Sequence, residues 1–109
     1  MSVKYCCVLS TVASIKKART LAGLLVFRRL AACVQILPGL ESHYRWRGKK
    51  ETTKEVLLLI KTKASLYKKL EKTLLKNHPY EVPEIICLPI TQGSKRYLSW
   101  IDTEVISSR

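Results

Sequence analysis

The chain is 109 residues long and carries 20 lysines and arginines against 8 acidic residues, a formal net charge of +12. Its apolar content of 47% is enough for one buried core and argues against a disordered chain. We therefore expect a single domain over residues 1–109. The excess of basic charge permits an anionic partner such as nucleic acid, but it identifies none.

Two features of the sequence bear on where the protein resides. No apolar run reaches the length of a membrane helix, and no secretory signal pattern opens the chain, so we expect a cytoplasmic protein with no membrane partner. The sequence has no CxxC pair, and its four cysteines lie in apolar segments: Cys6, Cys7, Cys33 and Cys87. This pattern favours reduced side chains in a core over a metal or redox site.

The first elements in the chain are a strand and a helix. Val3–Ser10 is apolar and rich in residues that favour strands. Ser14 is suited to cap the N-terminus of a helix that runs to about Arg29. Apolar residues at helical spacing predict the buried stripe of this helix: Ile15, Ala18, Ala22, Leu25 and Val26.

The central stretch predicts two long strands joined at a polar tip. From Leu40 to Arg47 the two faces alternate strictly, as in a strand with one wet face. Pro38-Gly39 suits a kink or bulge within one bent strand, because tight hairpins prefer primed turns. The chain then reverses in the glycine-containing, charged stretch 48–53. The apolar run of residues 56–60 predicts a second strand with both faces covered.

A second helix is expected to begin at Ser65 and to end at Asn77-His78-Pro79, where proline stops helices. Its leucines at positions 66, 70 and 74 face the core. Its lysines at positions 68, 69, 72 and 76 are interpreted as a solvated face rather than a nucleic-acid stripe. Ile85–Ile90 is predicted to be an edge strand, because Pro89 cannot donate to a neighbouring strand.

A turn at residues 92–95 and a short helix over Tyr97–Val105 complete the chain. The order predicts an α+β, ferredoxin-like βαββαβ sandwich with a long bent hairpin and a short C-terminal helix. The two arms of the hairpin are longer than a small four-stranded sheet requires. Because their free edges need cover, we expect an oligomer.

Sequence motifs along nearly the whole chain resemble the CutA divalent-cation tolerance family. The matching segments are Leu30-Ala31-Ala32-Cys33-Val34, Pro38-Gly39, Tyr44, Trp46, Gly48-Lys49, Glu55-Val56, Lys61-Thr62, His78-Pro79-Tyr80-Glu81-Val82-Pro83-Glu84 and Tyr97-Leu98-Ser99-Trp100. The resemblance implies a cytoplasmic homotrimer formed by strand pairing between subunits, with an architecture similar to that of PII proteins. It also implies a role in tolerance to divalent cations, copper above all, and no well-established catalytic reaction.

The metal ligands implied by the resemblance are only partly present. The family's cysteine position is Ser10 here, and the first of its two histidine positions is Asn77, so only His78 matches. Copper(II) needs several ligands, and Glu81, Glu84 or a group from another subunit would have to complete its coordination. The alternative is that His78 caps the preceding helix for local reasons.

The arms carry a second group of candidate residues. Tyr44 and Trp46 face the same way and are candidates to line a cleft between subunits, with Lys61 as its charged anchor. Tyr80 and Glu81 are further candidates for this cleft. The alternative for the aromatic pair is packing at a subunit interface without any ligand.

The sequence bears on three classes of function. A trimeric, non-catalytic protein that binds copper(II) or another divalent cation follows from the resemblance. A basic ferredoxin-like module that binds nucleic acid or another anion is the alternative, although the aromatic signature of RNA-recognition strands is absent. An enzyme is not expected, because the sequence has no phosphate-binding loop or nucleophile elbow and only two histidines, His43 and His78.

Overall fold

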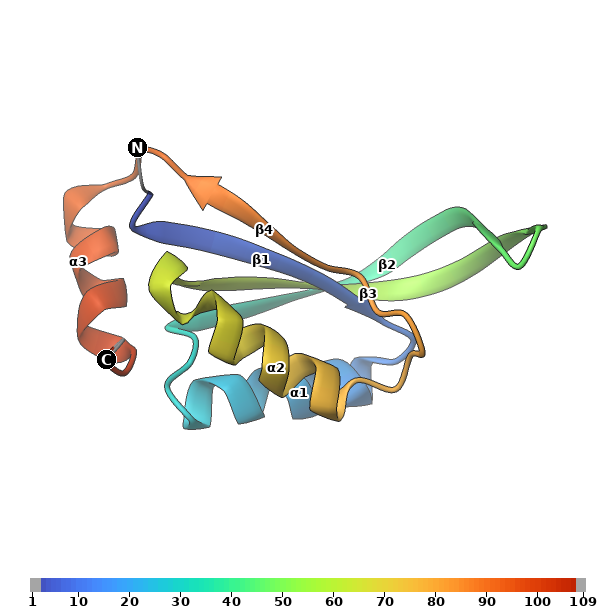
Figure 1. The fold of residues 1–109 in the computed structure, drawn as a ribbon, viewed down its shortest axis with the longest axis horizontal. Helices are drawn as coiled ribbons and strands as arrows, with labels where there is room; N and C mark the ends of the chain where they lie inside the picture. The colour runs from blue at the N-terminus through green and yellow to red at the C-terminus, as the bar shows by residue number, and fades with distance from the viewer. Residues whose placement is uncertain (1–2, 108–109) are drawn as a thin grey trace.

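The computed structural model describes residues 3–107, in which four strands and three α-helices follow one another (Figure 1). Their bounds are β1 (Tyr5–Val12), α1 (Ile15–Phe27), β2 (Cys33–Trp46), β3 (Lys49–Lys63), a 3-10 turn (Ala64–Leu66), α2 (Tyr67–Asn77), β4 (Ile85–Ile90) and α3 (Lys95–Glu104). The strands form one sheet in the order β2-β3-β1-β4, with every neighbouring pair antiparallel. β3 therefore lies between β1 and β2, which run in the same direction. The predicted α+β arrangement is confirmed.

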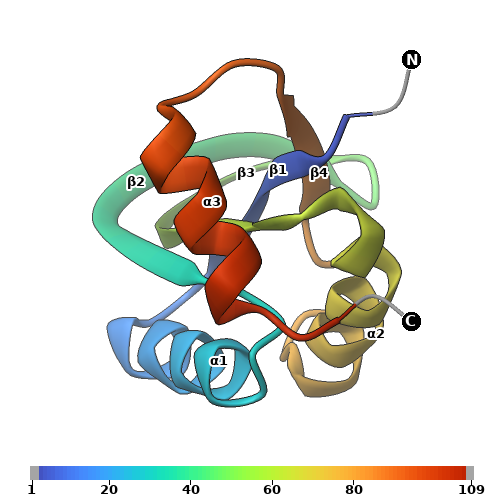
Figure 2. The same ribbon diagram turned by 90° about the vertical axis from the view of Figure 1, so that its left-hand side faces the viewer.

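The two faces of the sheet are covered differently. α1 and α2 lie side by side on one face, whereas α3 lies at one end of the sheet (Figures 1 and 2). Side chains alternate between the faces along β3: Val56, Leu58 and Ile60 are buried under the helices, while Leu57 and Leu59 are half-buried on the other side. The prediction that both faces of this run are covered therefore holds in full for the helix-bearing face only.

α1 begins where the sequence predicts it but is rotated about its axis. The Oγ of Ser14 accepts a hydrogen bond from the backbone N–H of Lys17 at 3.1 Å, which confirms the cap. The stripe packed on the sheet is Ala18, Leu21 and Leu25. Ile15 and Val26, which were expected in this stripe, are exposed instead. The apolar residues of this helix extend around more than half of its circumference, so their spacing did not define which side faces the sheet.

The hairpin of β2 and β3 projects beyond the body of the protein (Figure 1). The register between the strands shifts between Leu37 and Leu40, which confirms the predicted bulge, and Gly39 has a positive φ of 85° there. The strands reverse at Arg47-Gly48, whose φ angles of 51° and 80° are typical of a type I′ turn. The predicted reversal over residues 48–53 is right for Gly48 and wrong for the rest, because β3 begins at Lys49.

α2 begins later than predicted. Ser65 lies within the 3-10 turn, and the capping position belongs to Leu66, which offers no side-chain oxygen. The buried leucines at positions 66, 70 and 74 are confirmed. The helix ends at Asn77, and His78 is extended with ψ of 137° because a residue before proline avoids helical angles.

The remaining elements differ from prediction mainly at their ends. β1 runs from Tyr5 to Val12 rather than from Val3 to Ser10, and α3 begins two residues before the predicted Tyr97. β4 is an edge strand, as Pro89 predicted.

The cysteines differ in exposure. Cys6 is buried and Cys7 is half-buried, on opposite faces of the sheet, whereas Cys87 is exposed. The expectation of a core position is therefore wrong for Cys87. None of the helices within residues 3–107 is long and apolar enough to cross a membrane.

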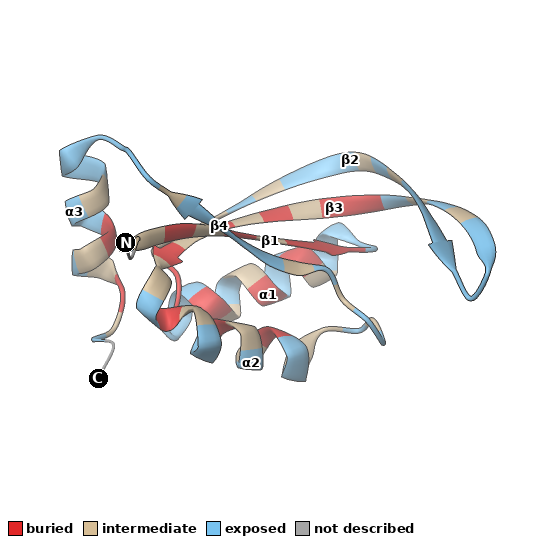
Figure 3. Ribbon diagram, turned by 45° about the horizontal axis from the view of Figure 1, so that its top comes forward, coloured by how far each residue is buried: buried red, intermediate tan, exposed pale blue. Residues whose placement is uncertain are grey.

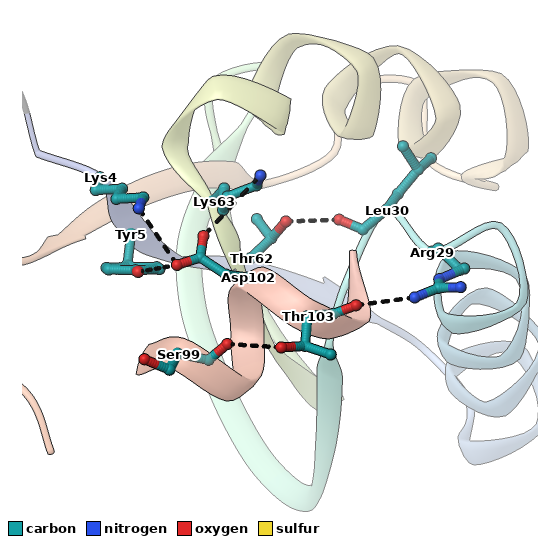
Figure 4. Close-up of polar contacts among 9 residues, drawn as sticks. All are labelled: Lys4, Tyr5, Arg29, Leu30, Thr62, Lys63, Ser99, Asp102 and Thr103. Atoms are coloured by element: carbon teal, nitrogen blue, oxygen red, sulfur yellow. Dashed lines mark hydrogen bonds and ion pairs between the residues drawn. The ribbon is translucent and has the colours of Figure 1, made fainter. Parts of the chain in front are cut away.

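Polar contacts fasten α3 to the end of the sheet (Figure 4). The carboxylate of Asp102 accepts a hydrogen bond from the hydroxyl of Tyr5 and lies 3.3 Å from Nζ of Lys4. These partners lower the pKa of Asp102, with the Tyr5 hydrogen bond as the largest cause. The guanidinium of Arg29 donates to the backbone carbonyls of Thr103 and Glu104, both at 2.9 Å. The end of α1 thereby holds the end of α3.

Two buried hydroxyls on the helix-bearing side of the sheet provide a test of this packing. The hydroxyl of Thr62 donates to the carbonyl of Leu30 at 2.6 Å, whereas Oγ of Ser10 has no hydrogen-bond partner among residues 3–107. We predict that Thr62→Val lowers the free energy of unfolding by about 1–3 kcal/mol, because the Leu30 carbonyl loses its buried partner. Ser10→Ala should leave it unchanged or raise it by about 1 kcal/mol.

Urea unfolding at one fixed protein concentration measures both variants. The packing described for Ser10 is contradicted if Ser10→Ala destabilises the protein as much as Thr62→Val does.

Candidate functional site

His78 fastens the end of α2 to the end of β1. Its Nε2 lies 2.9 Å from the backbone carbonyl oxygen of Thr11, which can only accept, so Nε2 carries the hydrogen. Its Nδ1 accepts a hydrogen bond from the backbone N–H of Tyr80 at 3.2 Å. The ring is therefore neutral, and both of its nitrogens are engaged. Burial of the ring lowers the pKa of His78 below its usual value of 6.5, although the Thr11 carbonyl acts in the opposite direction.

Tyr80 links His78 to a buried carboxylate. Its ring lies edge-on to the imidazole of His78, with centroids 4.9 Å apart. Its hydroxyl donates to Oε2 of Glu55 at 2.7 Å, and burial together with this carboxylate raises the pKa of Tyr80. Glu55 is only 8% exposed, and no cation pairs with it among residues 3–107. Sequence reasoning placed Glu55 in a motif but did not identify its partner, because the two residues are 25 positions apart.

A single chain does not assemble a metal site from these residues. Within residues 3–107 no three His, Cys, Asp or Glu side chains converge in a way that would hold a cation. Ser10 points into the core beneath the helices, and the amide of Asn77 donates to the carbonyl of Thr73 at 2.8 Å. Glu81 pairs with Arg47 at 3.1 Å. His78 would have to give up one of its two hydrogen bonds to bind a metal, and further ligands would have to come from another copy of the chain.

The aromatic candidates lie on the projecting arm. Tyr44 and Trp46 are about two-fifths exposed, and the guanidinium of Arg47 lies 5.4 Å from the centre of the Trp46 ring. A shallow cavity of about 310 Å³ opens on this arm, lined by His43, Tyr44, Arg45, Lys50, Glu51 and Thr52. His43 is exposed, and its Nε2 lies 2.7 Å from Oε2 of Glu41. The arm thus presents aromatic and charged side chains to a partner.

Lys61 lies far from these aromatic residues within one chain. It pairs with Cys33 at one end of the hairpin and hydrogen-bonds the side chain of Gln35, whereas Tyr44 pairs with Glu51 near the other end. Lys61 lies ten positions after Glu51 along β3, which corresponds to a distance of roughly 33 Å. A cleft that contains both Lys61 and the aromatic pair therefore requires a second copy and stays a prediction.

The face of the sheet opposite α1 and α2 is apolar and largely uncovered, and we call it the open face. Exposed strand and α3 side chains on this side are Leu37, Ile86, Leu88, Tyr97 and Trp100. Figure 3 shows that β2 and β4, at the two edges, are mostly exposed, while the buried positions concentrate in β1 and β3. The sequence predicted uncovered strand edges but not this face. An apolar residue in a strand indicates burial, but it does not indicate whether a helix of the same chain or another chain covers it.

Comparisons with known proteins agree with this geometry. The family model of the CutA1 divalent ion tolerance protein matches residues 6–104. The chain is 51% identical over 94 residues to the divalent-cation tolerance protein CutA of Thermus thermophilus, covering 86% of this chain and 91% of that protein. It is 48% identical over 91 residues to the chloroplastic CutA of Arabidopsis thaliana, of which it spans 50%.

Solved structures show the same fold. The divalent cation tolerance protein of Thermus thermophilus matches with a TM-score of 0.90 and 48% identity, covering 93% of this chain and 98% of that one. CutA1 of Oryza sativa matches with a TM-score of 0.92 and 43% identity over 96% of each chain. The matches in sequence and in fold extend over almost all of the described residues, and the chain belongs to the CutA divalent-cation tolerance family.

Proposed function

We propose that the protein works as a homotrimer that binds divalent cations, copper(II) among them, and that it has a non-catalytic role in tolerance to these ions. The observation that supports an assembly is the open face. A surface that exposes Leu37, Leu88 and Trp100 together is unfavourable in water and is typical of an interface between chains. The names of the related proteins supply the link to divalent cations.

Free strand edges support closure by several copies. β2 and β4 are the two edge strands, and the outer edge of each has no partner strand within residues 3–107. Exposed edges of this kind pair readily with other chains. If the arm of one copy pairs along an edge of the next, a ring of copies covers the edges and the open faces together.

The same assembly would bring together residues that one chain keeps apart. Tyr44 and Trp46 on the arm of one copy would meet the Lys61 end of the sheet of a neighbour. A cation bound there would need nitrogen, oxygen or sulfur ligands from more than one copy, and copper(II) competes best among common divalent ions for such groups.

We also propose that the protein works in the reducing cytoplasm, because none of its four thiols forms a disulfide within residues 3–107.

Two leucines of equal exposure test the assembly. Leu37 on the open face is 55% exposed, and Leu75 on the outer surface of α2 is 54% exposed. We predict that the native mass by light scattering is three times the 12.5 kDa of one chain. Leu37→Glu should shift the protein toward the single-chain mass, because it buries an unpaired charge in the interface, whereas Leu75→Glu should leave the mass unchanged. A single-chain mass for the unsubstituted protein would refute the assembly.

His78 should govern part of the pH dependence of stability. Because its pKa is lowered in the folded protein, the folded state binds fewer protons than the unfolded state as the pH falls. Its contribution is fully present above the unfolded value of about 6.5 and is lost as the pH falls through that value toward the folded pKa. We predict that His78→Ala weakens this part of the pH dependence and lowers stability at pH 8 by about 1–2 kcal/mol. Urea unfolding at pH 8 and pH 5 provides the measurement, and an unaltered pH profile would contradict the prediction.

Copper(II) titration by calorimetry tests His78 as a ligand. Because both ring nitrogens are engaged in hydrogen bonds, we expect the trimer to bind copper(II) through other groups and His78→Ala to bind with unchanged affinity. The control is Lys68→Gln, an exposed position at the other end of α2 that adds no carboxylate, thiol or imidazole. A clear loss of affinity in His78→Ala alone would place the imidazole among the ligands.

A further inference from the structure

The outer faces of α1 and α2 form a strongly basic surface, which we call the basic layer. Segments 15–28 and 67–77 contain eight lysines and arginines and one acidic residue, a net +7 of the chain's +12. The eight cations are Lys16, Lys17, Arg19, Arg28, Lys68, Lys69, Lys72 and Lys76. None of them forms an ion pair within residues 3–107, and the one acid, Glu71, accepts a hydrogen bond from Tyr67.

Apolar side chains stand among these cations. Phe27 is 85% exposed at the end of α1, immediately before Arg28. Ile15 and Val26 on α1 and Leu75 on α2 are also exposed. Figures 1 and 2 show the two helices side by side and antiparallel, so their outer faces form one continuous surface. Several large apolar side chains exposed on one surface are typical of an interaction site.

We propose that the basic layer is a peripheral docking surface for membranes rich in anionic phospholipid. Lysines and arginines would lie at the level of the phosphates, with their aliphatic stems against the surface. Phe27, Val26 and Leu75 would enter the boundary between headgroups and acyl chains. This combination of basic and large apolar residues on one helical face is typical of interfacial helices.

The apolar residues favour lipid over nucleic acid as the partner. A phosphate backbone offers nothing to Val26 or Leu75, and binding of single strands relies on several stacking aromatic side chains. Phe27 is the one exposed aromatic side chain in residues 15–28 and 67–77. The lack of a spanning segment led to the expectation of no membrane partner, but peripheral binding requires no such segment.

The basic layer lies on the opposite side of the sheet from the open face (Figure 1). Contacts between copies through the open face would therefore leave the basic layer exposed, and the docking surface exists whether the protein is a trimer or a single chain. In an assembly, several basic layers could contact one membrane, and their attractions would reinforce one another.

Co-sedimentation with lipid vesicles tests the docking surface. The full chain is mixed with phosphatidylcholine vesicles, or with vesicles in which about a third of the lipid is phosphatidylglycerol. We expect binding to the anionic vesicles only, and this binding should weaken strongly in high salt because the charges are exposed. Short duplex and single-stranded DNA, in the same low-salt buffer, serve as competitors.

Two variants and a charge-matched control locate the contact. Lys68→Gln with Lys72→Gln should weaken partitioning about 25-fold, since each surface cation is worth about a fivefold factor. Phe27→Ala should weaken it about tenfold. Lys95→Gln with Arg96→Gln removes the same charge from α3, away from the basic layer, and should have a much smaller effect.

Three results would overturn the docking surface. One is the lack of binding to anionic vesicles at low salt. Another is a loss of binding in the α3 control as large as in the α2 variant, which would indicate attraction by net charge alone. The third is DNA that binds more tightly than the vesicles and displaces them, which would assign the basic layer to nucleic acid. Light scattering on each variant shows whether its mass, and so its assembly, is unchanged.

Discussion

The unequal covering of the two faces of the sheet is the constraint on which the rest of the structure depends. The side-chain period of two along β3 sends Leu58 and Ile60 toward the helices and Leu57 and Leu59 to the other side. Both sets are apolar, so both need to leave water, but the chain supplies helices for one face only. α3 covers just one end of the second face, fastened there by Asp102 and Arg29. One chain therefore covers one face of its sheet with helices and leaves most of the other face exposed.

Polar groups near the end of β1 are joined to neighbouring segments by hydrogen bonds. Thr11 pairs with β3 but lies beyond Ser10, the last residue of β1 that pairs with β4. Its backbone carbonyl accepts a hydrogen bond from the ring of His78 instead. The imidazole also holds the backbone of Tyr80, whose hydroxyl satisfies the buried carboxylate of Glu55. Each of these groups would cost free energy if left unpaired, so the chain from β1 through the α2–β4 loop to β3 is held by one connected set of hydrogen bonds. A histidine that completes such a set is poorly suited to be a labile metal ligand.

Much of the fold could be predicted because its signals are local. The Ser14 cap, the Pro38-Gly39 bulge and the edge position of Pro89 each follow from the chemistry of one or two residues. The rotation of α1 could not be predicted, since Ile15 and Val26 are as apolar as Leu21 and only the sheet decides which side is buried. Arg47 in a left-handed conformation also carries no sequence signal, because arginine is not a usual turn residue.

The candidate site was predicted less well than the fold, for the same physical reason. His78 was singled out from its neighbours in the sequence, but its bond to Thr11 joins positions 67 residues apart. The separation of Lys61 from Tyr44 was visible earlier, since the predicted hairpin places Tyr44 near its tip and Lys61 at its far end. Contacts that depend on register and on packing between elements become visible only when the sheet is assembled.

The concentration of lysines and arginines on α1 and α2 causes electrostatic repulsion, and the single chain has too few acidic residues nearby to offset it. Lys68, Lys72 and Lys76 stand at successive i, i+4 positions, where like charges destabilise a helix by about 0.2–0.5 kcal/mol per pair. Packed helices lie about 8–10 Å apart, within the screening length of about 10 Å at 0.1 M salt, so the cations of α1 also repel those of α2. The two helices carry one acidic residue, Glu71, and the others lie on the arm, in the loop before β4 and on α3. The helices persist because Leu70 and Leu74 are buried, and their exposed charge is left to be neutralised by something outside the chain.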